Sequence, residues 1–276
     1  MSTAFSKQNA QVDIRRVGSS ADHQTDVIAL EVPVALVYNC MSYAVMMTTP
    51  NDLEEFALGF SLSEGIIHDH SELHDVTCIN EGKAGLTVHM QISQDRLAEL
   101  KTRRRNMTGR TGCGLCGTES LKQAIRSIKK VNATEISDEA IQKALGLLPK
   151  FQPLQIATGA THAAAWCDLK GNILLAREDV GRHNALDKLI GALIGSNFNR
   201  QQGFTLVTSR ASYEMVQKCC SVGIGGLVAV SAPTLLAIEQ AQEAGLTLVG
   251  FARNGRHVIY NNPATHYDLP QALIAL

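Results

Sequence analysis

Strands and helices alternate regularly between residues 203 and 253 of this 276-residue chain. Three short apolar segments, GFTLVTS, GLVAVSA and LTLVGFA, are separated by SYEMVQKCCSVG and PTLLAIEQAQEAG, whose apolar residues follow a helical spacing. Nearly continuous apolar strands between helices are typical of a parallel sheet covered on both faces, because each crossover helix must pack against the sheet. The alternation therefore predicts a three-layer α/β unit with a largely parallel sheet.

The same unit extends upstream and downstream of this alternation. THAAAWCDLKGNILLARED predicts two strands around a turn at Lys170–Asn172, GRHNALDKLIGAL predicts a helix, and HVIYNN predicts a last strand. Another helix is predicted over 138–148, because the hydroxyl of Ser137 can accept a hydrogen bond from the free N–H groups of a first turn.

The N-terminal part of the chain has a different pattern. Valine-rich segments at 27–39 and 42–49 predict strands, and DVTCINEGKAGLTVHMQI predicts a hairpin that turns at Gly82–Gly85. Between them, TPNDLEEFALGFSLSEG predicts a helix with Thr49 as its N-cap and Gly65 at its end. This pattern predicts a small α+β unit.

Overall, these patterns divide the chain into three parts. Residues 1–25 are polar and aperiodic, so we expect a flexible N-terminal tail. Residues 26–105 then form the small α+β domain, and 106–276 form the α/β domain.

Composition excludes several classes of protein. The net charge is −1 with 18% charged residues, which gives no electrostatic reason to expect nucleic acid as a partner. The longest apolar run, GIGGLVAVSAPTLLAI, is interrupted by Gly, Ser and Pro, so no membrane span is expected. The N-terminus shows no export signal, and the seven cysteines have no disulfide-framework spacing. We therefore expect a cytoplasmic protein.

Polar and cationic residues follow several of the predicted strands. Ligands bind beyond the carboxyl ends of the strands in open parallel sheets, and free N–H groups at helix starts favour anions. Taken singly, each of these residues is better explained as a helix cap or a solvated side chain, so the prediction of a phosphate-bearing ligand depends on their convergence at one edge. The residues are Asp179, Arg182, His183, Lys188, Ser209, Arg210, Ser212, Ser231, Thr234, Arg253 and Arg256, with Asp179 the expected cap of the helix after Gly181.

Two cysteines, Cys113 and Cys116, lie in the glycine-rich segment RTGCGLCGTESL. A structural zinc site would need a second close pair, and the adjacent Cys219 and Cys220 lie in a predicted helix where their side chains diverge. A zinc deaminase would need His-x-Glu and Pro-Cys-x-x-Cys, but alanines follow His162 and no proline precedes the pair.

Two further interpretations of the pair involve sulfur chemistry. Dithiol oxidoreductases place Cys-x-x-Cys at the start of a helix after a strand, whereas this pair follows a basic stretch on a glycine-rich segment. A sulfur acceptor needs an accessible thiolate with freedom to move, and nearby glycines and the arginines of KTRRR favour both. The residues alone leave these alternatives open.

Five segments in order, GRTGCGLCG, THAAA, EDVGRHNALDK, SRASYEMVQK and VGFARNGR, closely resemble the FdhD/NarQ family of sulfur carrier proteins, which formate dehydrogenase activity requires. The resemblance runs from about EVPVALVYN to VIY, nearly the whole chain. It implies a cytidine deaminase-like fold in the second domain without deaminase zinc chemistry, no tightly bound structural metal, and a homodimer.

The resemblance also implies a function. Family members accept sulfur from a cysteine desulfurase and transfer it to molybdenum bis(molybdopterin guanine dinucleotide), the cofactor destined for formate dehydrogenase. By this resemblance Cys113 carries the persulfide and Cys116 is a supporting thiol. The cofactor site it implies is Phe251, Ala252, Arg253, Asn254, Gly255 and Arg256. A non-catalytic cofactor-binding chaperone for formate dehydrogenase is the alternative function.

Overall fold

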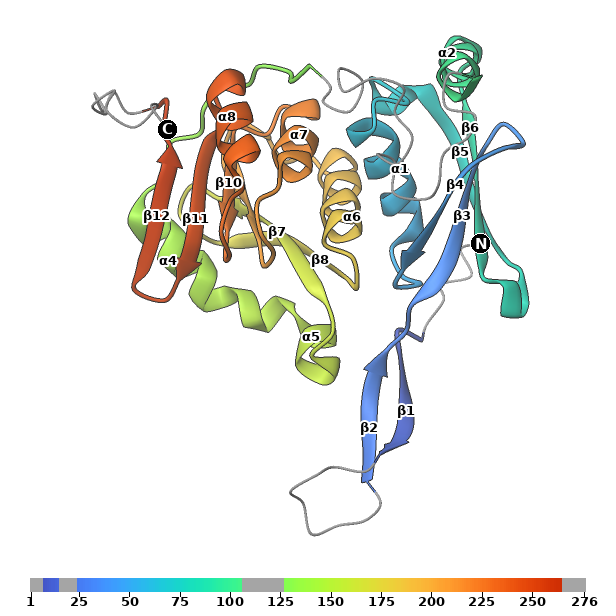
Figure 1. The fold of residues 1–276 in the computed structure, drawn as a ribbon, viewed down its shortest axis with the longest axis horizontal. Coiled ribbons are helices and arrows are strands. Elements are labelled where there is room, and N and C mark those ends of the chain that lie inside the picture. The colour runs from blue at the N-terminus through green and yellow to red at the C-terminus, as the bar shows by residue number, and fades with distance from the viewer. Residues whose placement is uncertain (1–6, 15–23, 106–126, 265–276) are drawn as a thin grey trace.

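The computed structural model describes residues 7–14, 24–105 and 127–264, which form three β-sheets and the helices around them (Figure 1). Cys113 and Cys116 lie outside the described residues. The strands are β1 (Asn9–Ile14), β2 (Gln24–Ala29), β3 (Val32–Tyr38), β4 (Met41–Thr48), β5 (Leu73–Asn80), β6 (Leu86–Ile92), β7 (His162–Asp168), β8 (Ile173–Asp179), β9 (Gly203–Val207), β10 (Gly226–Ala229), β11 (Thr247–Arg253) and β12 (Arg256–Asn261). The helices are α1 (Leu53–Ser63), α2 (Gln94–Arg105), α4 (Asp138–Leu147), α5 (Pro153–Thr158), α6 (Arg182–Ile194), α7 (Tyr213–Ser221) and α8 (Leu235–Ala244), with 3₁₀ turns η1 (His70–Glu72), η2 (Gly82–Ala84) and η3 (Leu148–Phe151).

The smaller sheet has the order β4-β3-β6-β5 and is built from the predicted strands of the N-terminal part. The predicted hairpin is confirmed as β5 and β6, which pair antiparallel around η2. The predicted N-cap of α1 is wrong. The helix begins at Leu53 after Asp52, which has a left-handed φ of 54°, and Thr49 bonds elsewhere.

The larger sheet has the order β12-β11-β10-β9-β7-β8. Strand β10 pairs parallel with both β9 and β11. Strand β7 pairs antiparallel with both β8 and β9, and β12 pairs antiparallel with β11. The expectation of a largely parallel sheet is therefore wrong, because tight turns join β7 to β8 and β11 to β12, and a tight turn reverses the chain.

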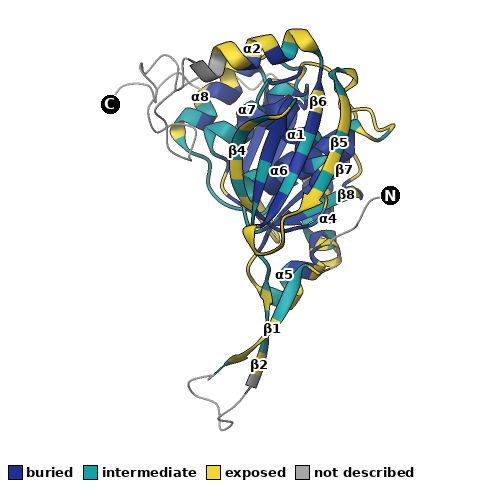
Figure 2. Cartoon of the chain, turned by 90° about the vertical axis from the view of Figure 1, so that its right-hand side faces the viewer, coloured by how far each residue is buried: buried dark blue, intermediate teal, exposed yellow. Residues whose placement is uncertain are grey.

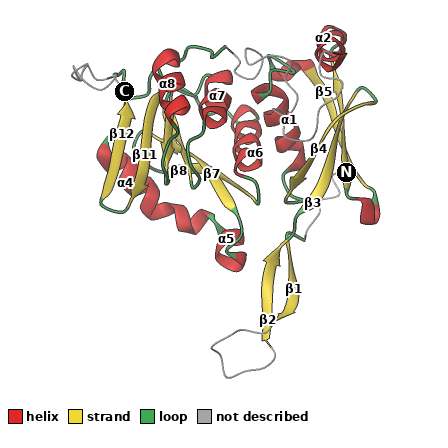
Figure 3. Cartoon of the chain, in the orientation of Figure 1, coloured by secondary structure: helices red, strands yellow, loops and turns green. Residues whose placement is uncertain are grey.

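Helices cover both faces of the larger sheet, as Figures 1 and 3 show. On one face, Ala165 and Cys167 of β7 pack in one hydrophobic cluster with Ile141 of α4. The alternate residues of β7, Ala164 and Trp166, pack in a second cluster with α6, α7 and α8. This alternation confirms the three-layer arrangement.

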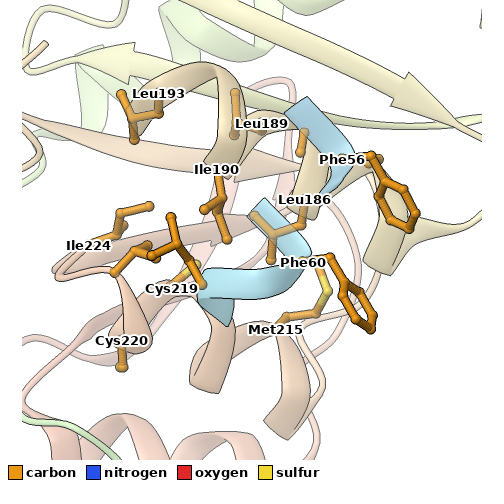
Figure 4. Packing of buried hydrophobic residues seen from close by; sticks show 14 of the residues in the cluster. Phe56, Phe60, Leu186, Leu189, Ile190, Leu193, Met215, Cys219, Cys220 and Ile224 are labelled. Carbon is orange, nitrogen blue, oxygen red and sulfur yellow. The ribbon is translucent and has the colours of Figure 1, made fainter. Parts of the chain in front are cut away.

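The second cluster also joins the two sheets, since it contains residues of β3, β6 and α1 together with those of α6. Figure 4 shows the part of this cluster where residues of α1 and α6 lie close together. Helices α1 and α6 approach each other backbone to backbone. A Cβ added at Gly59 would lie 1.8 Å from the carbonyl oxygen of Asp187, and one at Gly191 would lie 1.9 Å from that of Glu55. Glycine at both positions is what permits this close packing.

Strands β1 and β2 form an antiparallel hairpin that projects from the rest of the molecule (Figures 1 and 2). Residues 9–14 were expected to belong to a flexible tail, and the structure places β1 there instead. Its residues are half-buried or exposed, so the polar sequence is compatible with a two-stranded ribbon that lies against α5 through β2.

Candidate functional site

The carboxyl ends of β8, β9, β10 and β11 lie at one edge of the larger sheet, where the sequence predicted a convergence of polar segments. Hydrogen bonds connect the segments across this edge. Ser231 N–H donates to the carbonyl of Ser209 at 3.3 Å, and Phe251 N–H donates to the carbonyl of Ser231 at 3.1 Å. Because β7 runs antiparallel to β9, its first residue, His162, also lies here, with Nδ1 3.3 Å from Oγ1 of Thr208.

The predicted cofactor segment, Phe251 to Arg256, forms the end of β11 and the turn into β12. Phe251 has a φ of +49° and a side chain that is 41% exposed. A left-handed conformation in a residue with a bulky side chain is strained by about 1–3 kcal/mol, so the surrounding structure must hold it. Gly255, at φ +75°, occupies a turn position that favours glycine.

One residue of this segment packs into the core and the others face the surface. Ala252 is fully buried in the cluster beneath the sheet, whereas Arg253, Asn254 and Arg256 are exposed. The segment therefore presents two guanidinium groups and one aromatic side chain to solvent. That combination suits a ligand with phosphates and a flat ring.

Two pockets lie against this turn, and Arg253 lines both. The first, about 320 Å³, is lined by Phe251, Arg253, Arg256, His257 and Val258. The second, about 400 Å³, is lined by Leu145, Gly146, Leu148, Pro149, Gln152, Thr208, Val230, Ala252, Arg253 and Asn254. None of these described lining residues carries a carboxylate, so both pockets favour an anionic ligand.

Helix α4 holds the turn in place. Gly255 N–H donates to Oε1 of Gln142 at 2.7 Å. Nε2 of His257 lies 2.9 Å from a carboxylate oxygen of Asp138, and its Nδ1 lies 3.2 Å from Nε2 of Gln142. The two walls of the larger pocket, the α4 side and the β11–β12 turn, are therefore fixed relative to each other.

A second group of polar side chains lies at the first residue of β7 and at the starts of α6 and α7. Nε2 of His183 lies 2.8 Å from Oε2 of Glu214. This contact lowers the pKa of Glu214. Burial, together with the nearby Arg182 and His183, lowers the pKa of His162. The Nε of Arg182 and the Oγ of Ser212 are buried atoms without a hydrogen-bond partner among the described residues.

Asp179 was expected to cap α6, but Gly181 is the N-cap residue. The Asp179 carboxylate accepts hydrogen bonds from Gly181 N–H at 2.8 Å and from the N–H of Thr49 at 3.0 Å, and also from the hydroxyls of Thr48 and Thr49. The ammonium of the fully buried Lys188 lies 2.7 Å from it. Asp179 thus joins the loop before α6 to the end of β4.

Sequence reasoning missed the role of Thr48 and Thr49 in this group. Both are fully buried. Their one available signal was an adjacent pair of hydroxyl residues at the end of an apolar strand, which is equally typical of a helix cap.

The described cysteines differ sharply in accessibility. Cys167, Cys219 and Cys220 are fully buried, and burial raises the pKa of each, to about 12 for Cys220. Burial also raises the pKa of the half-buried Cys78 to about 11. Cys40 is the one exposed thiol among the cysteines that the structure describes.

The described residues contain no cluster of three or more His, Cys, Asp or Glu side chains suited to a metal ion. Within the same residues, none of the helices is long and apolar enough to cross a membrane.

The model of the FdhD/NarQ family matches residues 29–266 of the chain. The chain belongs to the FdhD/NarQ family. Among similar FdhD/NarQ proteins, "Sulfur carrier protein FdhD" of Cupriavidus necator is 54% identical over 239 residues, covering 86% of this chain and 83% of the relative. The protein of the same name from Xanthomonas oryzae is 51% identical over 249 residues, covering 90% and 88%. The resemblance seen in the motifs is thereby confirmed.

The FdhD/NarQ fold is also seen in a solved structure. The crystal structure of a "putative formate dehydrogenase accessory protein" from Desulfotalea psychrophila superposes with a TM-score of 0.71 at 22% identity, covering 93% of this chain and 97% of that one. The mixed α+β architecture predicted from the sequence is therefore shared with a solved structure.

Proposed function

We propose that this protein is a sulfur carrier that accepts sulfur from a cysteine desulfurase as a persulfide. It then delivers the sulfur to molybdenum bis(molybdopterin guanine dinucleotide) for formate dehydrogenase. The observation that carries the proposal is the match, over most of the chain, to relatives named as sulfur carriers. In the proposed first step, a thiolate of this chain attacks the terminal sulfur of the donor persulfide. The S–S bond of the donor breaks, a new Cys–S–SH forms, and the desulfurase thiolate leaves.

The burial of three of the described cysteines is compatible with Cys113 as the acceptor and Cys116 as a supporting thiol, the roles that the family resemblance implies. A thiol must be accessible and ionised to attack a donor persulfide. The buried Cys167, Cys219 and Cys220 meet neither condition. The family resemblance, rather than this exclusion, is what assigns acceptance of sulfur to Cys113 and Cys116, which lie outside the described residues. Among the described cysteines the exposed Cys40 is the competing site.

The geometry of the β11–β12 turn supports the cofactor as cargo. Each guanine dinucleotide carries phosphates, and the exposed guanidinium groups of Arg253 and Arg256 lie beside a pocket with no carboxylate among its described lining. Phe251 offers an exposed ring for stacking. The proposal includes the expected homodimer, cytoplasmic location and cytidine deaminase-like second domain.

Intact-mass spectrometry tests the carrier function. The protein is incubated with a cysteine desulfurase and cysteine, and its mass is compared before and after reduction. We expect a reducible gain of one sulfur atom in the wild type and in Cys40→Ala, and no gain in Cys113→Ala. A gain that Cys113→Ala retains and Cys40→Ala loses would contradict the assignment.

A second measurement separates the carrier from the chaperone alternative. In cells that lack the native protein, Cys113→Ala should abolish formate dehydrogenase activity while the purified variant unfolds at the wild-type temperature. A chaperone that only binds the cofactor would tolerate Cys113→Ala and Cys116→Ala and would lose function with Arg253→Ala. That outcome would refute sulfur transfer.

A further inference from the structure

The turn between β11 and β12 contains the one Asn-Gly pair in the sequence, Asn254 and Gly255. Both residues are exposed. Gly255 has a φ of +75°, and a Cβ added there would meet nothing within 4 Å among the described residues. The backbone of Gly255 is therefore open on the side where another residue would carry its side chain.

An exposed Asn-Gly pair can lose ammonia without an enzyme. The backbone nitrogen of the glycine gives up its proton and attacks the side-chain amide carbon of the asparagine. A new C–N bond forms, ammonia leaves, and a succinimide ring results. Water then opens the ring at either carbonyl carbon and leaves aspartate or isoaspartate. Glycine favours the attack because no Cβ crowds its nitrogen.

A hydrogen bond from the turn to α4 restrains the attacking nitrogen. Gly255 N–H donates to Oε1 of Gln142 at 2.7 Å. The proton that must leave the nitrogen is the one in this hydrogen bond, so it becomes available only when the turn opens away from α4. Nε2 of Gln142 lies 3.2 Å from Nδ1 of His257, and this second contact keeps the amide oxygen directed at the turn.

We propose that Asn254 is a site of spontaneous deamidation and that Gln142 slows the reaction by holding Gly255 N–H. Asn254 and Arg253 both line the larger pocket, whose described lining has no carboxylate. Each conversion places a carboxylate beside Arg253, where it offsets the guanidinium charge and repels an anionic ligand. This consequence, unlike the modification itself, rests on the anionic cargo of the proposed function.

Peptide mapping by mass spectrometry tests the proposal on the full chain, incubated at neutral and at mildly alkaline pH. We expect aspartate and isoaspartate at position 254, formed faster at the higher pH, while Asn132, which is exposed and followed by Ala133, stays intact. Gln142→Ala removes the acceptor and should speed the conversion about fivefold, the factor typical of one neutral hydrogen bond. Gln142→Glu keeps an acceptor oxygen and should convert as slowly as the wild type. A synthetic peptide of residues 250–258 gives the unprotected rate, and thermal unfolding checks that each variant is folded.

The outcomes separate the modification from its consequence. If Asn254 stays intact in Gln142→Ala under conditions that convert the peptide, the modification site is wrong. If the wild type and Gln142→Ala convert at the same rate, Gln142 does not protect the pair.

Isothermal titration calorimetry with pyrophosphate tests the consequence. Asn254→Asp should bind pyrophosphate several-fold more weakly than the wild type, and the uncharged Asn254→Ser should bind it as the wild type does. Equal binding by Asn254→Asp and the wild type would refute the repulsion. A wild type that does not bind pyrophosphate would contradict the cargo site of the proposed function, whereas the deamidation measured by peptide mapping would stand.

Discussion

Replacing Gly59 by Ala should destabilise the protein by forcing α1 and α6 apart. The new Cβ would lie 1.8 Å from the carbonyl oxygen of Asp187 and 2.8 Å from the backbone nitrogen of Gly191. Ordinary contact begins near 3.4 Å, so the helices must separate by roughly 1.5 Å at this point. The obstacle is backbone, which cannot change rotamer. The separation also loosens the surrounding contacts of Phe56 and Leu186 shown in Figure 4.

The expected size of the effect is a net loss of about 2 kcal/mol in the free energy of unfolding. Overpacking a core costs about 1–3 kcal/mol, and a backbone clash lies at the upper end of that range or beyond it. The gain in helix propensity from Gly to Ala offsets up to about 1 kcal/mol. Gly191→Ala, with its Cβ 1.9 Å from the carbonyl of Glu55, should behave in the same way. The double variant should lose less than the two single losses added, because the first substitution already separates the helices.

Equilibrium urea unfolding followed by circular dichroism measures these losses. Gly146→Ala is the matched control, because Gly146 is also helical and a Cβ there meets nothing within 4 Å. That variant should be as stable as the wild type or slightly more stable. If Gly59→Ala and Gly146→Ala have the same unfolding midpoint, the close packing of α1 on α6 does not exist as described.

Three further predictions concern polar groups that are buried or half-buried. Glu178→Ala removes the acceptor for the first N–H groups of α5 and should cost about 0.5–2 kcal/mol in urea unfolding; unchanged stability, with unchanged hydrogen exchange in α5, would refute its capping role. In an NMR titration, the imidazole of His162 should show a pKa below its usual value, and Arg182→Gln should raise that pKa. An unchanged His162 pKa in Arg182→Gln would show that the arginine does not contribute to the shift. Because the folded pKa of His162 is lowered, its contribution to stability is present above the unfolded pKa and is lost as the pH falls through the folded value. Lys188→Met leaves the buried Asp179 carboxylate without its cation and should cost about 3–5 kcal/mol, which urea unfolding would detect; a loss below about 1 kcal/mol would show that the remaining donors suffice.

The sequence predicted the local features of the larger sheet well. Ser137 was expected to cap the helix at 138–148, and its hydroxyl accepts from Ala140 N–H at the start of α4. The turn at Lys170–Asn172 joins β7 to β8 as expected. Signals of this kind succeed because they depend on residues a few positions apart, whose chemistry the sequence displays directly.

The same reasoning failed where a distant group competes for the same atoms. Thr49 and Asp179 each have the side-chain oxygen that a helix cap needs, and each was assigned to the helix next to it. In the folded chain they bond to each other across 130 positions, and Lys188 completes the group. Burial favours these long-range interactions over local helix capping, because a buried charge is stable only when it is paired and hydrogen-bonded.

From the sequence alone came the strand and helix periods, the turns, the family and the cysteine pair, since all of these are encoded in neighbouring residues or in the order of short motifs. Tertiary structure alone decided the strand directions of the larger sheet, the glycine contact between α1 and α6, and the pocket that brings Gln152 to Arg253. These features depend on which surfaces pack together. Packing is a property of the whole chain, because each element can bury its apolar face only against the others.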